Sequence, residues 1–131
     1  MTRYDQFQEF RTRLNQRILG EKTPPPDGRP GGTLVTKRFF ALDTRAYDEG
    51  ALDTRTKELL GLVASLVLRC DDCVTYHLIR CKEEGVTDDE LLEACNVGLV
   101  VGGSIVIPHL RRAVDTLDQL NDGSTAPEDA R

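Results

Sequence analysis

The chain has 131 residues, a net charge of −5 and an isoelectric point near 5.0. Its length fits one domain, which buries roughly two-thirds of the surface that the unfolded chain exposes. The acidic balance argues against a nucleic-acid partner, because binding to phosphates requires clustered Lys and Arg. With no Trp and only 5% aromatic residues, the core must be built from Leu, Val, Ile and Ala, which favours helices.

No stretch of the sequence is typical of a leader or of a membrane helix. Residues 1–6 contain no apolar run, so we expect no signal peptide. The most apolar stretch, 95–108, is shorter than a bilayer span and includes Asn96 and three glycines. We therefore expect a cytoplasmic protein with no membrane partner. In that reducing compartment a close pair of cysteines is usually catalytic, redox-sensing or metal-binding.

The N-terminal part of the chain is set apart from the rest by its composition. Apolar side chains recur at helical spacing from Tyr4 onwards, so residues 1–19 are expected to hold a first amphipathic helix. Residues 20–35 form a Pro/Gly linker, because four prolines and four glycines between 20 and 33 exclude regular structure. Such a linker lets the first helix dock on a neighbouring subunit as readily as on its own domain. Residues 36–120 are expected to form a helical domain, followed by a disordered tail over 121–131.

Five further helices are expected within the helical domain. They run over 36–49, from Asp53 or Thr54 to Leu68, from Asp71 or Asp72 to Gly85, from Thr87 to Gly102, and from about Pro108 to Leu120. The helix that ends at Leu68 is apolar nearly all round, which predicts burial on most of its sides. Thr87 and Glu90 form a capping box at the start of the fifth helix. No alternating strand pattern occurs, so the predicted fold class is all-α with about six helices.

The fifth helix and the segment behind it carry an excess of apolar side chains. Between Leu91 and Ile107 they give more apolar surface than one small bundle easily covers. Large exposed apolar patches usually mark interfaces. The sequence therefore predicts a homo-oligomer that is formed partly by this segment.

The motif Cys70-Asp-Asp-Cys73-Val-Thr-Tyr-His77 is the strongest chemical signal in the chain. On a helix Cys70, Cys73 and His77 share one face, and positions 73 and 77 are close enough for their side chains to touch. A redox dithiol needs two adjacent thiols and one that ionises near neutral pH, which a helix N-terminus and an imidazole both favour. The charges of Asp71 and Asp72 raise the pKa of a thiol, so a dedicated base is needed, and His77 is the local candidate.

Glu58 lies near the start of an otherwise apolar helix. Gly61 and Ser65 follow one and two turns later on the same face, and such small residues allow another helix to approach beside the carboxylate. A glutamate in this setting needs a partner. His77 from the next helix would serve, and the pair would form a relay that takes a proton from a thiol.

The spacing of these residues carries a family resemblance. Glu58, eleven residues, Cys70-x-x-Cys73, three residues and His77 together resemble the signature of the carboxymuconolactone decarboxylase superfamily. More specifically, the pattern is similar to the alkylhydroperoxidase D-like branch, which keeps the Cys pair. The capping box and the paired glycines of the fifth helix also stand where that family has them. The resemblance covers roughly residues 40–120, without the first helix and the linker.

The resemblance implies an orthogonal bundle of helices, a trimer or hexamer, and a dithiol that reduces small peroxides. By position, Cys73 would be the thiol served by the proton relay of His77 and Glu58, and Cys70 would close the disulfide. No cofactor is expected apart from this redox-active disulfide. Family members are re-reduced by a dithiol partner such as a lipoylated or thioredoxin-like protein. Where the best-known peroxidases of the family have a second histidine, this chain has Asp72.

Three other interpretations of the same residues stay open. A structural zinc ion would use Cys70 and Cys73, although tetrahedral sites usually draw ligands from two separate segments. A binding or regulatory protein would use the dithiol to sense redox state or to stabilise its fold. A cofactor-free decarboxylase would use His77 and Glu58 as acid and base, and it would tolerate the loss of both cysteines.

The remaining cysteines and the second histidine have simpler interpretations. Cys81 and Cys95 are expected in the core, because a free cysteine packs like a small hydrophobic residue. His109 follows Pro108 at the start of the last helix. It is within reach of an active site or an interface, but we expect it to cap the helix or to pack.

Overall fold

All regular structure in the described part of the chain is helical, which confirms the all-α class. The computed structural model describes residues 1–20 and 28–122. Its elements are α1 (Arg3–Leu19), α2 (Leu34–Ala46), α3 (Thr54–Val67), α4 (Asp71–Glu83), α5 (Asp88–Gly102), the short 3-10 helix η1 (Ser104–Val106) and α6 (Ile107–Asn121). Residues 21–27 of the predicted linker, and most of the predicted tail, 123–131, lie outside the described residues. No helix in the described ranges is long and apolar enough to cross a membrane.

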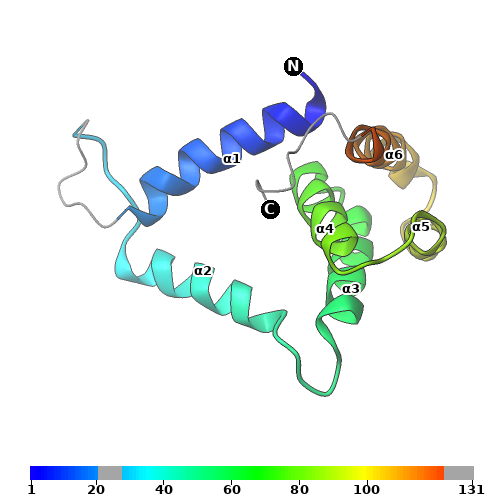
Figure 1. Ribbon diagram of the computed structural model, residues 1–131, viewed down its shortest axis with the longest axis horizontal. Helices are drawn as coiled ribbons and strands as arrows, with labels where there is room; N and C mark the ends of the chain where they lie inside the picture. Colours follow the sequence, from blue (N-terminus) through cyan, green and yellow to red (C-terminus); the bar gives the residue numbers. More distant parts are fainter. Residues whose placement is uncertain (21–27, 123–131) are drawn as a thin grey trace.

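Helices α3 to α6 form a packed body, and α1 and α2 form two arms that meet away from it (Figure 1). The other end of α1 docks on α6 of the same chain. Tyr4 is buried there, its backbone N–H donates to Oε1 of Gln119 at 2.9 Å, and Arg3 pairs with Asp115 at 3.3 Å. Of the two docking modes that the sequence left open for the first helix, the structure shows the one on its own domain.

The core lies between α3, α4, α5 and α6. Its buried aliphatic side chains include Leu62 and Leu66 of α3, Leu78 of α4, Leu91 of α5, Val106 of η1 and Leu117 of α6. Leu60 and Leu68, however, are 55% and 76% exposed on the other side of α3. The prediction that α3 is buried on most of its sides is therefore confirmed, and one apolar stripe of the helix has no cover within the single chain.

The start of α2 differs from the sequence prediction because side chains cap the helix earlier. α2 begins at Leu34, two residues before the predicted start, since Thr33 and Thr36 form a reciprocal capping box. It ends at Ala46, where the Tyr47 N–H turns back onto the carbonyl groups of Thr44 and Arg45. α5 starts as predicted, with the capping box of Thr87 and its partner at the third helical position.

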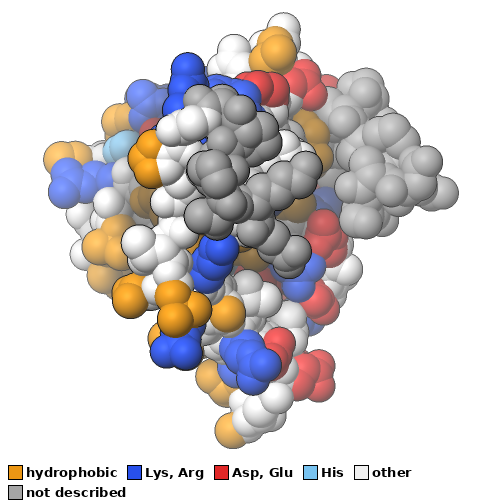
Figure 2. All heavy atoms as spheres, turned by 90° about the vertical axis from the view of Figure 1, so that its left-hand side faces the viewer, with side chains coloured by type: hydrophobic (Ala, Val, Ile, Leu, Met, Phe, Trp, Pro, Cys, Tyr) orange, Lys and Arg blue, Asp and Glu red, His pale blue; other side chains and the backbone are white. Residues whose placement is uncertain are grey.

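Exposed apolar side chains concentrate on α2 and on the end of α5. None of the residues of α2 is buried, and Val35, Phe39 and Leu42 are 66–77% exposed. On α5, Val100 and Val101 are 86% and 70% exposed. Figure 2 shows hydrophobic side chains together with Lys and Arg on the surface of the face that looks toward the α1–α2 end. The single chain thus leaves large apolar surfaces in contact with water.

Candidate redox site

A tight turn between α3 and α4 places the two cysteines at the start of a helix. Arg69 adopts φ 59° in this turn, and the Cys70 N–H donates to the Ser65 carbonyl at 3.0 Å. Cys70 then becomes the N-cap of α4, and its sulfur accepts the backbone N–H of Cys73 at 3.3 Å. The predicted caps were Asp71 or Asp72, and this prediction is wrong by one residue. The consequence is that one sulfur of the pair itself occupies the electropositive helix terminus.

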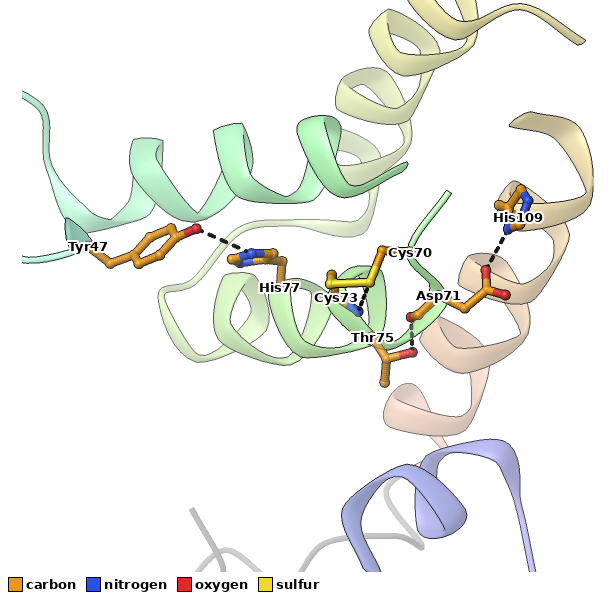
Figure 3. Close-up of a disulfide and its surroundings, with 7 residues drawn as sticks. All are labelled: Tyr47, Cys70, Asp71, Cys73, Thr75, His77 and His109. Carbon is orange, nitrogen blue, oxygen red and sulfur yellow. Dashed lines mark hydrogen bonds and ion pairs between the residues drawn. A yellow bond between two sulfur atoms is a disulfide. The ribbon is translucent and has the colours of Figure 1, made fainter. Parts of the chain in front are cut away.

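Cys70 and Cys73 form a disulfide (Figure 3). Their Cα atoms are 5.2 Å apart, as the three-residue spacing at a helix start allows. The Cys73 side of the bond is exposed, whereas Cys70 is half-buried beneath the turn. A thiolate from solution therefore reaches the Cys73 sulfur more readily than the Cys70 sulfur.

Glu58 and His77 form a buried pair that joins α3 to α4. Oε2 of Glu58 lies 2.8 Å from Nδ1 of His77, and the glutamate is 1% exposed. Because an ionised carboxylate only accepts hydrogen bonds, this contact assigns the ring proton to Nδ1 and leaves the lone pair on Nε2. Arg80 adds a cation on the other carboxylate oxygen, with its Nε 3.5 Å from Oε1. The imidazole is thus oriented as a base.

Small residues on α3 make this approach possible, as the sequence predicted. A Cβ atom added to Gly61 would lie 2.5 Å from Cε1 of His77 and within 3 Å of both ring nitrogens. Ser65, one turn further on, is buried as well. The imidazole therefore lies flat against the α3 backbone, and no larger residue fits beneath it.

Tyr47, which follows α2, contacts the other ring nitrogen of His77. Its hydroxyl lies 3.4 Å from Nε2, and the two rings are tilted with centroids 5.3 Å apart (Figure 3). Burial, and then the nearby charge of Glu58, raise the pKa of Tyr47, so that its hydroxyl remains protonated and donates to Nε2. No local pattern in the sequence pointed to this residue, because the contact joins positions 30 residues apart.

A cavity of about 640 Å³ opens beside the site, between the α1–α2 arms and α4. Cys73 and His77 both line it, whereas the other walls are mainly aromatic and aliphatic: Phe7, Phe10, Leu14, Ile18, Phe40 and Tyr76. In this disulfide form no hydrogen bond joins Cys73 to His77 among the described side chains. The structure thus brings the four predicted residues together as two pairs, a disulfide and a carboxylate–imidazole pair, and one member of each pair lines the same cavity.

The other predicted candidates lie elsewhere. Cys81 and Cys95 are free and buried in the core, and burial raises the pKa of both thiols, that of Cys81 to about 12. Within 1–20 and 28–122, no cluster of three or more His, Cys, Asp or Glu side chains is arranged to hold a metal ion. His109 neither caps nor merely packs: its Nδ1 lies 2.7 Å from Oδ1 of Asp71, inside the Cys70–Cys73 loop.

Fold and site together define an all-helical protein with a disulfide beside a buried carboxylate–imidazole pair. The chain belongs to the carboxymuconolactone decarboxylase family, whose model matches residues 34–116. α1 and most of the linker precede the matched region, which contains both cysteines, Glu58 and His77.

Relatives agree with this assignment. A Thermotoga maritima protein of the same family, suggested to take part in the antioxidative response, is 56% identical, with a TM-score of 0.77 over 89% of this chain and 91% of its own. A Legionella pneumophila family member, 23% identical, shares the fold with a TM-score of 0.66 over 92% of this chain and 96% of its own. An uncharacterized protein of the Paracoccus denitrificans cox locus is 29% identical over 69% of this chain and 81% of its own length.

Proposed function

We propose that the protein is a thiol–disulfide oxidoreductase of the alkylhydroperoxidase D-like branch, and that it reduces hydroperoxides through Cys70 and Cys73. The observation that carries the proposal is the shared cavity wall: Cys73, the exposed end of the disulfide, lies there beside an imidazole that is held on its other nitrogen by Glu58. A structural disulfide would need neither an oriented base nor an open cavity. The suggested antioxidative role of the Thermotoga maritima relative supports the same chemistry.

In the reduced protein, His77 accepts the proton of the Cys73 thiol at Nε2, directly or through the Tyr47 hydroxyl. The buried Glu58 carboxylate stabilises the imidazolium that forms. The Cys73 thiolate attacks one peroxide oxygen, the O–O bond breaks, and the products are a Cys73 sulfenic acid and an alcohol that takes up the proton. Cys70 then attacks the sulfenic sulfur, water leaves, and the disulfide seen in the structure forms.

Reduction of the disulfide uses the different exposure of the two sulfurs. An external dithiol, such as that of a lipoylated or thioredoxin-like protein, attacks the exposed Cys73 sulfur and forms a mixed disulfide. Cys70 leaves as a thiolate, which the Cys73 N–H and the α4 terminus stabilise. The second thiol of the donor then releases Cys73, so that the donor is oxidised and the protein returns to its dithiol form. Such donors belong to a reducing compartment, in keeping with a cytoplasmic location.

We further propose that a second copy of this chain covers the apolar faces of α2 and α5, in a trimer or hexamer. The exposed side chains on these helices are aliphatic or aromatic rather than charged, and monomers rarely keep such surfaces in water. Leu60 of α3 and Leu68, the residue that follows it, are exposed apolar side chains as well.

The test is consumption of a small organic hydroperoxide with a dithiol donor, in the wild type and in the Cys73→Ser, Cys70→Ser and Cys81→Ser variants. We expect Cys73→Ser and Cys70→Ser to abolish turnover, and Cys81→Ser to keep it, since Cys81 lies in the core. Equal rates in all four proteins would contradict the proposal. Reversible oxidation of the dithiol without turnover of peroxide would instead favour a redox sensor. A decarboxylase activity that survives both serine substitutions but is lost in His77→Ala would favour the decarboxylase interpretation.

A further inference from the structure

The loop that carries the dithiol is tied to α6 by one of its two carboxylates. Asp71 Oδ1 lies 2.7 Å from Nδ1 of His109, and Asp71 Oδ2 lies 3.5 Å from Nη1 of Arg112. The two partners are one turn apart on α6, so they meet the carboxylate from one helix face. Figure 3 shows the disulfide between the His77–Tyr47 pair on one side and the Asp71–His109 pair on the other.

The carboxylate of Asp71 stands in the least favourable place for a dithiol that must ionise. It is the residue next to Cys70 and two residues before Cys73, at the first position of α4. A negative charge at such a distance opposes formation of a thiolate, because the two like charges repel one another in partly buried surroundings. The Arg112 guanidinium offsets part of that charge, and the contact with His109 directs the carboxylate toward α6.

Asp72, the second carboxylate of the loop, has different surroundings from Asp71. It is exposed and lines the cavity, and among the described residues it has no ion pair. The charged and titratable groups around the dithiol come from every packed element. They are Glu58 on α3, Arg69 in the turn, Asp71, Asp72, Tyr76 and His77 on α4, Asp43 on α2 with Tyr47 behind it, Arg11 on α1, and His109 and Arg112 on α6. Only the pair on α6 is in contact with a carboxylate of the Cys70–Cys73 loop among these described residues.

We propose that His109 and Arg112 are positioning residues that hold the Asp71 carboxylate against α6 and so permit ionisation of the dithiol beside it. They act through Asp71 and touch neither sulfur nor substrate. The inference rests on the proposed function in that it concerns the same two thiols. Its test, however, needs no peroxide, since thiolate formation is measured directly.

The experiment is a pH titration of the reduced protein, which follows thiolate absorbance near 240 nm and the rate of iodoacetamide alkylation at Cys70 and Cys73. We expect His109→Ala and Arg112→Ala each to lower the thiolate fraction at neutral pH by roughly 3- to 10-fold. His109→Gln, which keeps an N–H donor, and Arg112→Lys, which keeps the charge, should restore part of it. Arg111→Ala removes an equal charge from the exposed side of α6 and should change nothing.

The decisive comparison is the same His109→Ala change in two backgrounds. In Asp71→Asn there is no carboxylate to compensate, so loss of His109 should have no effect on the thiolate fraction. In Asp72→Asn, where Asp71 is intact, the 3- to 10-fold effect should persist. An equal effect in both backgrounds, or none in the wild type, would overturn the inference. If the wild type shows no peroxide turnover but His109→Ala still lowers the thiolate fraction, that result would count against the proposed function and leave this coupling untouched.

Discussion

Gly61 on α3 lies directly beneath the His77 ring, so close that a Cβ atom there would stand 2.5 Å from Cε1. The contact explains how an imidazole from α4 reaches a carboxylate rooted three residues earlier on α3. Any side chain on Gly61 must push the ring away, and Nδ1 then loses its 2.8 Å contact with Glu58.

We therefore expect Gly61→Ala to lower hydroperoxide turnover by at least about 10-fold, through loss of an oriented base. Alanine gains about 1 kcal/mol of helix propensity over glycine, and the forced displacement costs about 1–3 kcal/mol, so stability should fall by about 0–2 kcal/mol. Gly98→Ala is the matched control, because its Cβ would meet the core side chain of Leu66 at 3.1 Å and no residue of the redox site. It should keep the turnover of the wild type. Equal losses in both variants would show that packing alone matters.

Glu58→Gln separates the charge of the carboxylate from its shape. Glutamine fills the same buried space but no longer stabilises an imidazolium, so turnover should fall about 100-fold or more. Glu83→Gln is the control: Glu83 pairs with the same Arg80 at the protein surface and does not contact His77. The measurement is turnover across pH 5–9 for both variants. A wild-type rate in Glu58→Gln would remove Glu58 from the mechanism.

The four cysteines should react in two separate classes. Burial and the nearby Glu58 charge raise the pKa of Cys81 to about 12, and burial raises that of Cys95, so both remain protonated thiols at pH 8. After reduction, iodoacetamide at pH 8 should add only two groups to the native protein, at Cys70 and Cys73, and four groups in denaturant. Intact-mass analysis followed by peptide mapping checks this. Modification of Cys81 in the native state would show that the core opens.

Much of this fold follows from local patterns in the sequence. The helix spacing, the capping box at Thr87 and the small residues of α3 each act within a few positions, and each predicted the structure found. The pairing of Glu58 with His77 was also predictable, since a carboxylate on an apolar helix must find a partner. Local signals of this kind need no knowledge of how the helices are arranged.

The contacts that escaped prediction join residues far apart in the chain. Tyr47 meets His77 across 30 positions, and His109 meets Asp71 across 38. Neither pair leaves a periodicity or a spacing that marks it, because each depends on which helices become neighbours. The N-cap role of Cys70 was not predicted for another reason. Serine, threonine, aspartate and asparagine are the usual N-caps, and two aspartates follow Cys70 directly in the sequence.

Glu90 should make the stability of α5 depend on pH in the acid range. Hydrogen bonds from Arg55, and from Thr87 at the helix start, lower the pKa of Glu90 to about 2 in the folded protein, from a usual value of 4.5. The stabilisation is therefore fully present above pH 4.5 and is lost as the pH falls toward 2. We expect Glu90→Gln to lower the thermal midpoint at pH 7 and to match the wild type at pH 2. Glu93→Gln, at an exposed position of the same helix, should be without effect at either pH.

If the chains associate through these apolar faces, one charge added within the interface should dissociate the oligomer. Val100 is 86% exposed on α5, so Val100→Glu costs the monomer nothing in packing, whereas an interface would bury an unpaired carboxylate at a cost of several kcal/mol. Light scattering on a sizing column should show the wild type as a multiple of 14.6 kDa and Val100→Glu shifted toward that mass. Gln6→Glu adds the same charge at an exposed position of α1 and should leave the assembly intact. A wild type that stays at 14.6 kDa over the micromolar range would rule out the second copy as the cover of these faces.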